Sequence, residues 1–147
     1  TGANTSNGAA WRYGASTFTP NPPRAADALM IVDLPYPPTV NHYWLASGHR
    51  RYISPAGQRF RRDAAWLISA ARRGQKPANR LLEVSVTVEV YPPDRRRRDL
   101  DNILKPILDA LQHSMVIEDD SQVAELRVWR CERKRGGAIR VKVTSLI

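Results

Sequence analysis

The feature that most constrains the fold is a strict alternation of apolar and polar residues over positions 82 to 90. The apolar members are Leu82, Val84, Val86, Val88 and Val90, and the residues between them are Glu83, Ser85, Thr87 and Glu89. Successive side chains of a strand point to opposite faces, so this pattern predicts a β-strand with one face in the core and the other in solvent.

The segments around this strand predict further elements. Residues 29–34 form an apolar strand candidate, and Ser54-Pro55 has the sequence of a helix start, with serine as N-cap and proline at the first position. Apolar residues at helical spacing then predict an amphipathic helix that ends near Gly74. They are Phe60, Ala64, Leu67, Ile68 and Ala71.

A second helix is predicted after the charged residues 92–99. Its apolar positions are Leu100, Leu104, Ile107, Leu108 and Leu111. Pro106 lies within it, so the helix is either kinked there or starts later. Residues 123–133 and 138–147 predict two closing strands joined as a hairpin around Gly136-Gly137. We therefore expect one small α+β domain, a mainly antiparallel or mixed sheet with two principal helices packed on one face.

The first 28 residues have a different composition from the rest. They are rich in Thr, Gly, Ala, Asn, Ser and Pro without hydrophobic periodicity, which predicts a flexible N-terminal extension before a domain of residues 29–147. Met30 is a candidate natural start. Cys131 is the only cysteine, and no apolar run approaches the roughly 20 residues of a membrane span. We expect a soluble, cytoplasmic protein.

Charge indicates the partner. Twenty-three basic residues, mostly arginine, against fourteen acidic ones give a net charge of +9, which favours a polyanion such as nucleic acid. Seven of the fourteen acidic residues nevertheless lie between positions 94 and 120. Carboxylates repel DNA unless a divalent cation reverses the repulsion, so this cluster favours a metal site.

The centre of the acidic segment combines carboxylates, a lysine and arginines. Asp99 and Asp101 are two residues apart and can direct their carboxylates to one side, and Asp101, Lys105 and Asp109 follow at intervals of four on a polar helix face. The four arginines at 95–98 adjoin them. Arginines that hold a phosphodiester beside a cation that activates water are the components of a nuclease site.

Each part also has a structural interpretation. Asp99 and Asp101 could cap a helix, residues 118–120 could be a turn before the hairpin, and Lys105 could form only a surface salt bridge with Asp101. For an isolated Asp-x-Asp the capping interpretation is favoured. The metal site is therefore predicted from the combination of the carboxylates with Lys105 and the four arginines.

The residues of this segment resemble the RusA family of Holliday junction resolvases. The resemblance rests on residues 94–102 with the sequence DRRRRDLDN, on Lys105, on residues 109–111 (DAL) and on residues 119–123 (DDSQV). It extends upstream to residues 34–39 (LPYPPT), Asn41, Tyr43, Ser54, Gly57 and Gln58, and covers about residues 30–145.

The resemblance implies a role for each matched position. Asp99, Asp101 and Asp120 correspond to three catalytic, metal-binding aspartates, Lys105 to an active-site lysine, and Asp119 is a possible secondary ligand. Arg98 corresponds to a basic residue beside the site, and Asn41 and Tyr43 to residues of DNA binding or site architecture; we add Arg95, Arg96 and Arg97 as DNA contacts.

The resemblance also implies the activity. The family cuts branched DNA, four-way (Holliday) junctions, by paired symmetric hydrolysis in recombination and repair, as a Mg²⁺-dependent homodimer for which Mn²⁺ is a possible substitute, often in phage or prophage modules. Two alternatives stay open: a non-catalytic, structure-selective DNA-binding protein, and a different metal-dependent nuclease. Binding without hydrolysis would identify the first, and the geometry of the preferred substrate would identify the second.

Overall fold

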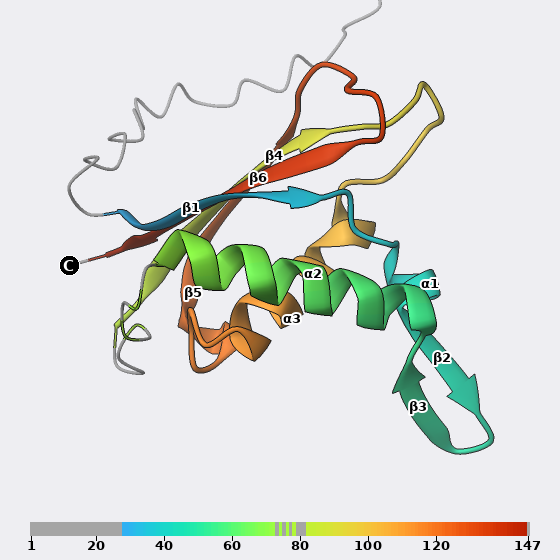
Figure 1. Ribbon diagram of the computed structural model, residues 1–147, viewed down its shortest axis with the longest axis horizontal. Coiled ribbons are helices and arrows are strands. Elements are labelled where there is room, and N and C mark those ends of the chain that lie inside the picture. The colour runs from blue at the N-terminus through green and yellow to red at the C-terminus, as the bar shows by residue number, and fades with distance from the viewer. Residues whose placement is uncertain (1–27, 73, 75, 77, 79–81, 147) are drawn as a thin grey trace, which may run out of the picture.

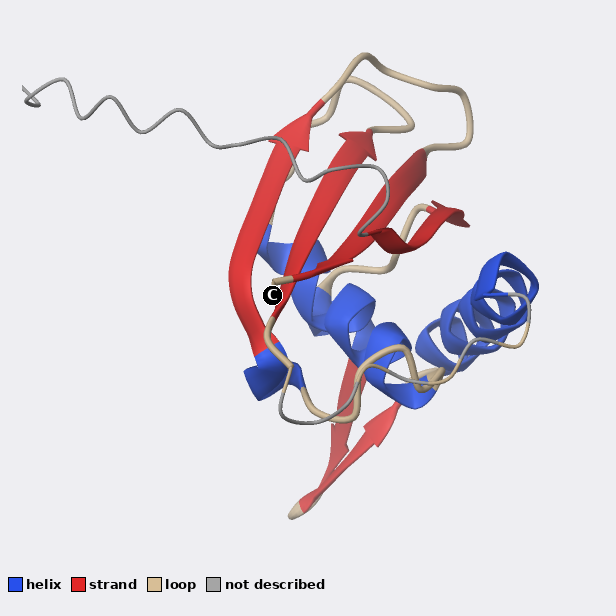
Figure 2. Cartoon of the chain, turned by 90° about the vertical axis from the view of Figure 1, so that its left-hand side faces the viewer, coloured by secondary structure: helices blue, strands red, loops and turns tan. Residues whose placement is uncertain are grey.

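The domain is built on a mixed four-stranded sheet with two long helices on one of its faces (Figures 1 and 2). The computed structural model describes residues 28–146 apart from 73, 75, 77 and 79–81. The sheet has the order β1-β6-β4-β5, with β1 at Ala28–Pro35, β6 at Ala138–Ser145, β4 at Val84–Tyr91 and β5 at Val123–Arg130. The covering helices are α2, Pro55–Arg72, and α3, Leu104–His113. This arrangement confirms the expected α+β fold class.

The alternating segment forms the centre of the core. Val84, Val86, Val88 and Val90 are between 0 and 1% exposed, and they belong to a cluster that includes residues of both covering helices. The apolar stripe of α2 completes the cluster through Phe60, Ala64 and Ile68. The two periodicities, two residues in the strand and about 3.6 in the helix, therefore identified both sides of the same core.

The predicted closing hairpin is wrong. Strand β5 pairs in parallel with β4, while β6 lies on the opposite side of β4 and is antiparallel to it. After β5 the chain passes beyond the end of β4, where the Cys131 amide donates to Val90 O at 2.8 Å and the Lys134 amide to Pro92 O at 3.0 Å. The physical reason is that parallel neighbours need a crossover, and α3 between β4 and β5 supplies one.

Helix α2 begins as predicted. The Gly57 amide donates to Ser54 Oγ at 3.0 Å, which is the capping bond of an N-cap serine. Gly57 also lies where a Cβ atom would come within 2.9 Å of Tyr43 O and 2.7 Å of Ile53 Cγ2, so glycine permits close contact with these neighbours. Tyr43 closes the short helix α1, Val40–Tyr43, which this contact ties to α2.

Pro106 is accommodated by a later helix start. A short 3-10 helix, η2, spans Asp101–Ile103, and α3 begins at Leu104. Pro106 is then the third residue of α3, in the first turn, where backbone N–H groups have no intrahelical acceptor. Of the two expected solutions, the later start is confirmed.

Two features complete the description. The strands β2, Trp44–Ser47, and β3, Arg50–Ile53, form a separate antiparallel hairpin that projects from the body of the domain (Figure 1). The proposed extension of residues 1–28 lies outside the described residues, except for Ala28, which begins β1. No helix in the described ranges is long and apolar enough to cross a membrane.

Candidate active site

The arginine run lies in the loop that follows β4, and one carboxylate holds its shape. Asp94 accepts a hydrogen bond from the Arg96 amide at 2.9 Å and two from the Arg98 guanidinium, one of them at 2.9 Å. These bonds hold the pKa of Asp94 well below its usual range, and the hydrogen bonding from the Arg98 side chain has the largest effect. The conformation of the loop is therefore held by hydrogen bonds between its own residues, with Asp94 as their common acceptor.

Arg98 is turned inward by further contacts. Its guanidinium carbon lies 5.8 Å from the centroid of the Tyr36 ring, and Arg130 donates to its carbonyl oxygen at 2.6 Å. These partners come from the ends of β1 and β5, so Arg98 ties the loop to the sheet. Its neighbours Arg95, Arg96 and Arg97 are all exposed. The run thus divides into one anchoring guanidinium and three that face solvent.

The first two predicted metal ligands lie directly after this loop. Asp99 is in the irregular segment before η2, Asp101 is the first residue of η2, and both are exposed. Neither side chain is hydrogen-bonded as a cap, because η2 and α3 have Leu100 and Ile103 at their N-cap positions, without side-chain capping bonds. The capping interpretation of these two aspartates is therefore not supported.

The third predicted ligand is presented by a tight turn. Asp119 caps the 3-10 helix η3, Asp120–Gln122, by accepting from the Ser121 amide at 2.8 Å, and Gln122 Oε1 accepts from the amides of Glu118 at 2.8 Å and Asp119 at 3.2 Å. This reciprocal pair is a capping box. The side chain of Gln122 also donates to Leu82 O at 3.0 Å, which fixes the turn against the segment before β4. A turn was one expected interpretation of residues 118–120, but the capping role of Asp119 was not predicted, although the Asp-x-x-Gln spacing carries its signal.

Lys105 connects the two halves of the site. Its Nζ lies 3.1 Å from Asp120 Oδ2, whereas the salt-bridge partner expected from the spacing was Asp101. The side chains of Lys105 and Asp120 are 52% and 41% exposed, and exposed pairs of this kind contribute only about 0.2 to 1 kcal/mol to stability. The contact brings a lysine of α3 beside an aspartate fifteen residues further along the chain.

The carboxylates are not gathered into a closed cage. Among the described residues no three His, Cys, Asp or Glu side chains lie close enough together to hold a metal ion. The chemistry of the donors does fit a hard divalent cation, since carboxylate oxygens are the ligands that Mg²⁺ and Mn²⁺ favour. Asp99, Asp101 and Asp120 are all at least partly exposed and could meet such a cation from two segments of the chain.

Asp109 contacts a different set of residues. The hydroxyl of Tyr43, a residue that is 0% exposed, donates to Asp109 Oδ2, and Arg61 Nε lies 3.3 Å from the same oxygen. Burial, reinforced by the Asp109 carboxylate, raises the pKa of the Tyr43 hydroxyl. This network joins α1, α2 and α3, so Tyr43 belongs to the architecture of the site and offers no surface to DNA. Asn41, two residues earlier, is exposed.

Comparison with known proteins adds to this geometry. The family model described as Endodeoxyribonuclease RusA matches residues 35–144. A crossover junction endodeoxyribonuclease of Enterobacteria phage HK97 is 43% identical over 113 residues, which is 77% of this chain and 92% of that protein. Proteins of the same name from Escherichia coli K12 and Enterobacteria phage 82 are each 35% identical over 115 residues, 78% of this chain and 93% of theirs.

Proposed function

This chain belongs to the RusA endodeoxyribonuclease family, and on that basis we propose that it is a metal-dependent endonuclease that resolves four-way DNA junctions. The observation that carries the proposal is the contact between Lys105 and Asp120, which joins the two segments of the acidic motif beside the arginine loop. This contact supports a site in which a lysine ammonium group, carboxylates and exposed arginines act together on DNA.

The arginine loop supplies the electrostatic attraction. Arg95, Arg96 and Arg97 are exposed and would contact phosphates without regard to sequence, while Arg98 keeps the loop folded through Asp94 and Tyr36. Because the loop leads directly into Asp99 and Asp101, a DNA sugar-phosphate backbone held by these arginines would lie beside the acidic residues.

The carboxylates would hold the cation. We propose that Asp99, Asp101 and Asp120 bind Mg²⁺, with Mn²⁺ as a possible substitute, and that Asp119 contributes mainly by shaping the turn that presents Asp120. When bound, the cation supplies Lewis-acid chemistry, activating water and neutralising charge that develops on the phosphate. Lys105, whose ammonium group contacts Asp120, would stabilise the same charge from the protein side.

The proposed substrate is the one for which the relatives are named, and its symmetry suggests the proposed assembly. A four-way junction with two-fold symmetry needs two matched incisions, and an isologous homodimer presents two identical sites related by that symmetry. We therefore propose that the active form is a homodimer in the cytoplasm of a bacterial cell, in recombination and repair of bacterial or phage DNA. Sedimentation of the purified protein should give the mass of two chains, and a monomer that cuts only one strand per binding event would contradict this.

A single cleavage experiment separates the proposal from its alternatives. Purified protein is incubated with a mobile four-way junction or with a linear duplex of the same sequence, in Mg²⁺ or in EDTA. We expect paired cuts in the junction, only with Mg²⁺, that a ligase can reseal. Equal cutting of the duplex would indicate a different nuclease, and binding without cutting under all conditions would indicate a non-catalytic DNA-binding protein.

A further inference from the structure

Most of the hairpin formed by β2 and β3 lies outside the core. It projects from the body of the domain (Figure 1), and Leu45 and Tyr52 on it are 38% and 46% exposed. A two-stranded hairpin is at best marginally stable alone. Its base is anchored by Trp44 and Ile53, which pack against the core, and by the bond that the Ser54 amide donates to Tyr43 O at 2.8 Å, whereas Leu45, Ala46, Ser47 and residues 50–52 are exposed. An exposed element with arginines and aromatic residues suits contact with a ligand better than structural support.

The pairing of the hairpin divides its side chains between two faces. Residues opposite one another in an antiparallel pair share a face, and successive residues alternate. Trp44 pairs with Ile53 and Ala46 with Arg51, so Trp44 and Arg51 share one face, while Arg50, opposite Ser47, lies on the other.

 The face that carries Trp44 and Arg51 is the one that lies beside Lys105.

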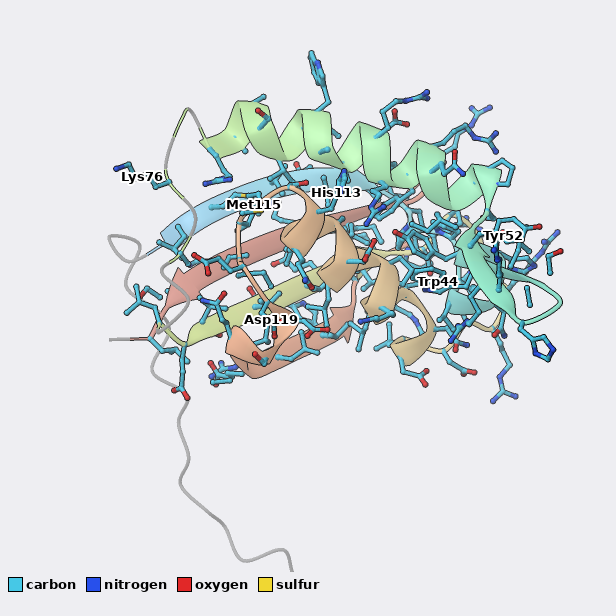
Figure 3. All side chains as sticks on the ribbon, turned by 90° about the horizontal axis from the view of Figure 1, so that it is seen from below. Trp44, Tyr52, Lys76, His113, Met115 and Asp119 are labelled. Carbon is cyan, nitrogen blue, oxygen red and sulfur yellow. The ribbon has the colours of Figure 1, made fainter. Side chains whose placement is uncertain are left out.

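This face lines a cavity beside the active-site lysine. Val40, Trp44, Arg51 and Lys105 line an open cavity of about 420 Å³, and the Arg51 guanidinium carbon lies 5.5 Å from the centroid of the Trp44 ring. Lys105 is also the residue whose Nζ contacts Asp120. The cavity therefore has an indole and a guanidinium on the hairpin side and the proposed catalytic lysine on the other. Figure 3 shows Trp44 and Tyr52 together at this end of the molecule.

The chemistry of the lining selects a flat, electron-rich ligand. Nucleobases stack on aromatic rings and on guanidinium planes, and an arginine fork can pair with the O6 and N7 acceptors of guanine. The cavity volume lies in the range of about 300 to 1,000 Å³ that is usual for small-ligand sites. The net charge of +9 also favours an occupant that belongs to a polyanion.

We propose that this cavity receives a nucleobase next to the scissile phosphate. The base would pack against the side chains of Trp44 and Arg51, and the Arg51 guanidinium would donate hydrogen bonds to the edge of the base. The inference rests on the proposed function, because Lys105 must lie at the scissile phosphate for the base to be its neighbour. The hairpin would then decide which base is accepted beside the cut, while the arginine loop holds the backbone without regard to sequence.

The test measures base preference, which a purely structural role of Arg51 would not change. Four junctions carry each of the four base pairs in turn beside the cut, and each is cleaved by the wild type and by Arg51→Ala, Arg51→Lys and Arg50→Ala. Arg50→Ala is the matched control, since it removes the same charge from the other face of the hairpin. Arg51→Lys keeps the charge but loses the planar fork.

We expect the wild type to prefer its best base over its worst by about tenfold or more. Both Arg51 variants should reduce that ratio to about twofold or less, while Arg50→Ala should preserve it. The inference fails if the wild type cuts all four junctions equally, or if the Arg51 variants and Arg50→Ala keep the same preference. A wild type that cuts no junction at all would overturn the proposed function and this inference together, which distinguishes the two failures.

Discussion

Replacing Lys105 by alanine should separate catalysis from stability. The Lys105 ammonium contacts Asp120 at 3.1 Å, but both side chains are about half exposed, so the loss of the pair should cost only about 0.2 to 1 kcal/mol of folding free energy. If the same ammonium stabilises charge on the phosphate in the transition state, its removal should slow the chemical step at least about a hundredfold, on the order of 3 kcal/mol. The expected effect on rate therefore exceeds the expected effect on stability.

Single-turnover cleavage of a junction, a gel-shift titration in EDTA and a urea melt measure the three quantities on one preparation. We expect the junction dissociation constant to change by less than tenfold, because one cation among many phosphate contacts is lost. The control is Lys76→Ala, since Lys76 is exposed and lies at the opposite end of the molecule from Trp44 and Tyr52 (Figure 3). A Lys105→Ala protein that melts, binds and cuts like the control would return Lys105 to the role of a surface salt-bridge partner.

Three further predictions concern the scaffold around the site. Tyr43→Phe removes a buried donor to the Asp109 carboxylate and should lower the free energy of unfolding by about 1.5 to 3 kcal/mol in a urea titration; a loss below about 0.5 kcal/mol would contradict the network. The Arg98 guanidinium holds the pKa of Asp94 below its unfolded value of about 3.9, so Asp94 stabilises the fold above that pH and this contribution is lost as the pH falls below it. Asp94→Asn should therefore flatten the loss of stability between about pH 5 and 2, and an unchanged slope would show that the pair is not formed. Deleting residues 1–27, which lack core periodicity, should leave the melting temperature and the cleavage rate unchanged, and a large drop in either would refute the assignment of an extension.

Local patterns predicted the elements of the fold well. The alternation around Val86 and the capping pair Ser54-Pro55 both depend on interactions between residues near in sequence, and both are confirmed. The pairing of β5 was mispredicted because strand neighbours are chosen by contacts distant in sequence, and Gly136-Gly137 resembles a hairpin turn on local grounds. The strand, helix and strand from β4 to β5 did carry the signal of a parallel crossover.

The site was predicted only in part, because local spacing does not indicate contacts between residues distant in sequence. Sequence spacing placed Lys105 beside the acidic motif, and its contact with Asp120 agrees with that placement. Helical spacing also put Asp109 on the polar face, yet its carboxylate meets Tyr43, sixty-six residues earlier, in a contact that no local pattern could indicate. The binding of a metal by Asp99, Asp101 and Asp120 stays a prediction.

The most direct test of the central claim compares binding and cutting by Asp101→Asn. This change removes one carboxylate charge from an exposed position without adding bulk or reducing the basic surface. On one labelled four-way junction, we expect the variant to bind with an affinity within about tenfold of the wild type and to cut at no detectable rate in Mg²⁺. Cutting by Asp101→Asn at close to the wild-type rate in Mg²⁺ would contradict the assignment of these aspartates as the metal-binding centre.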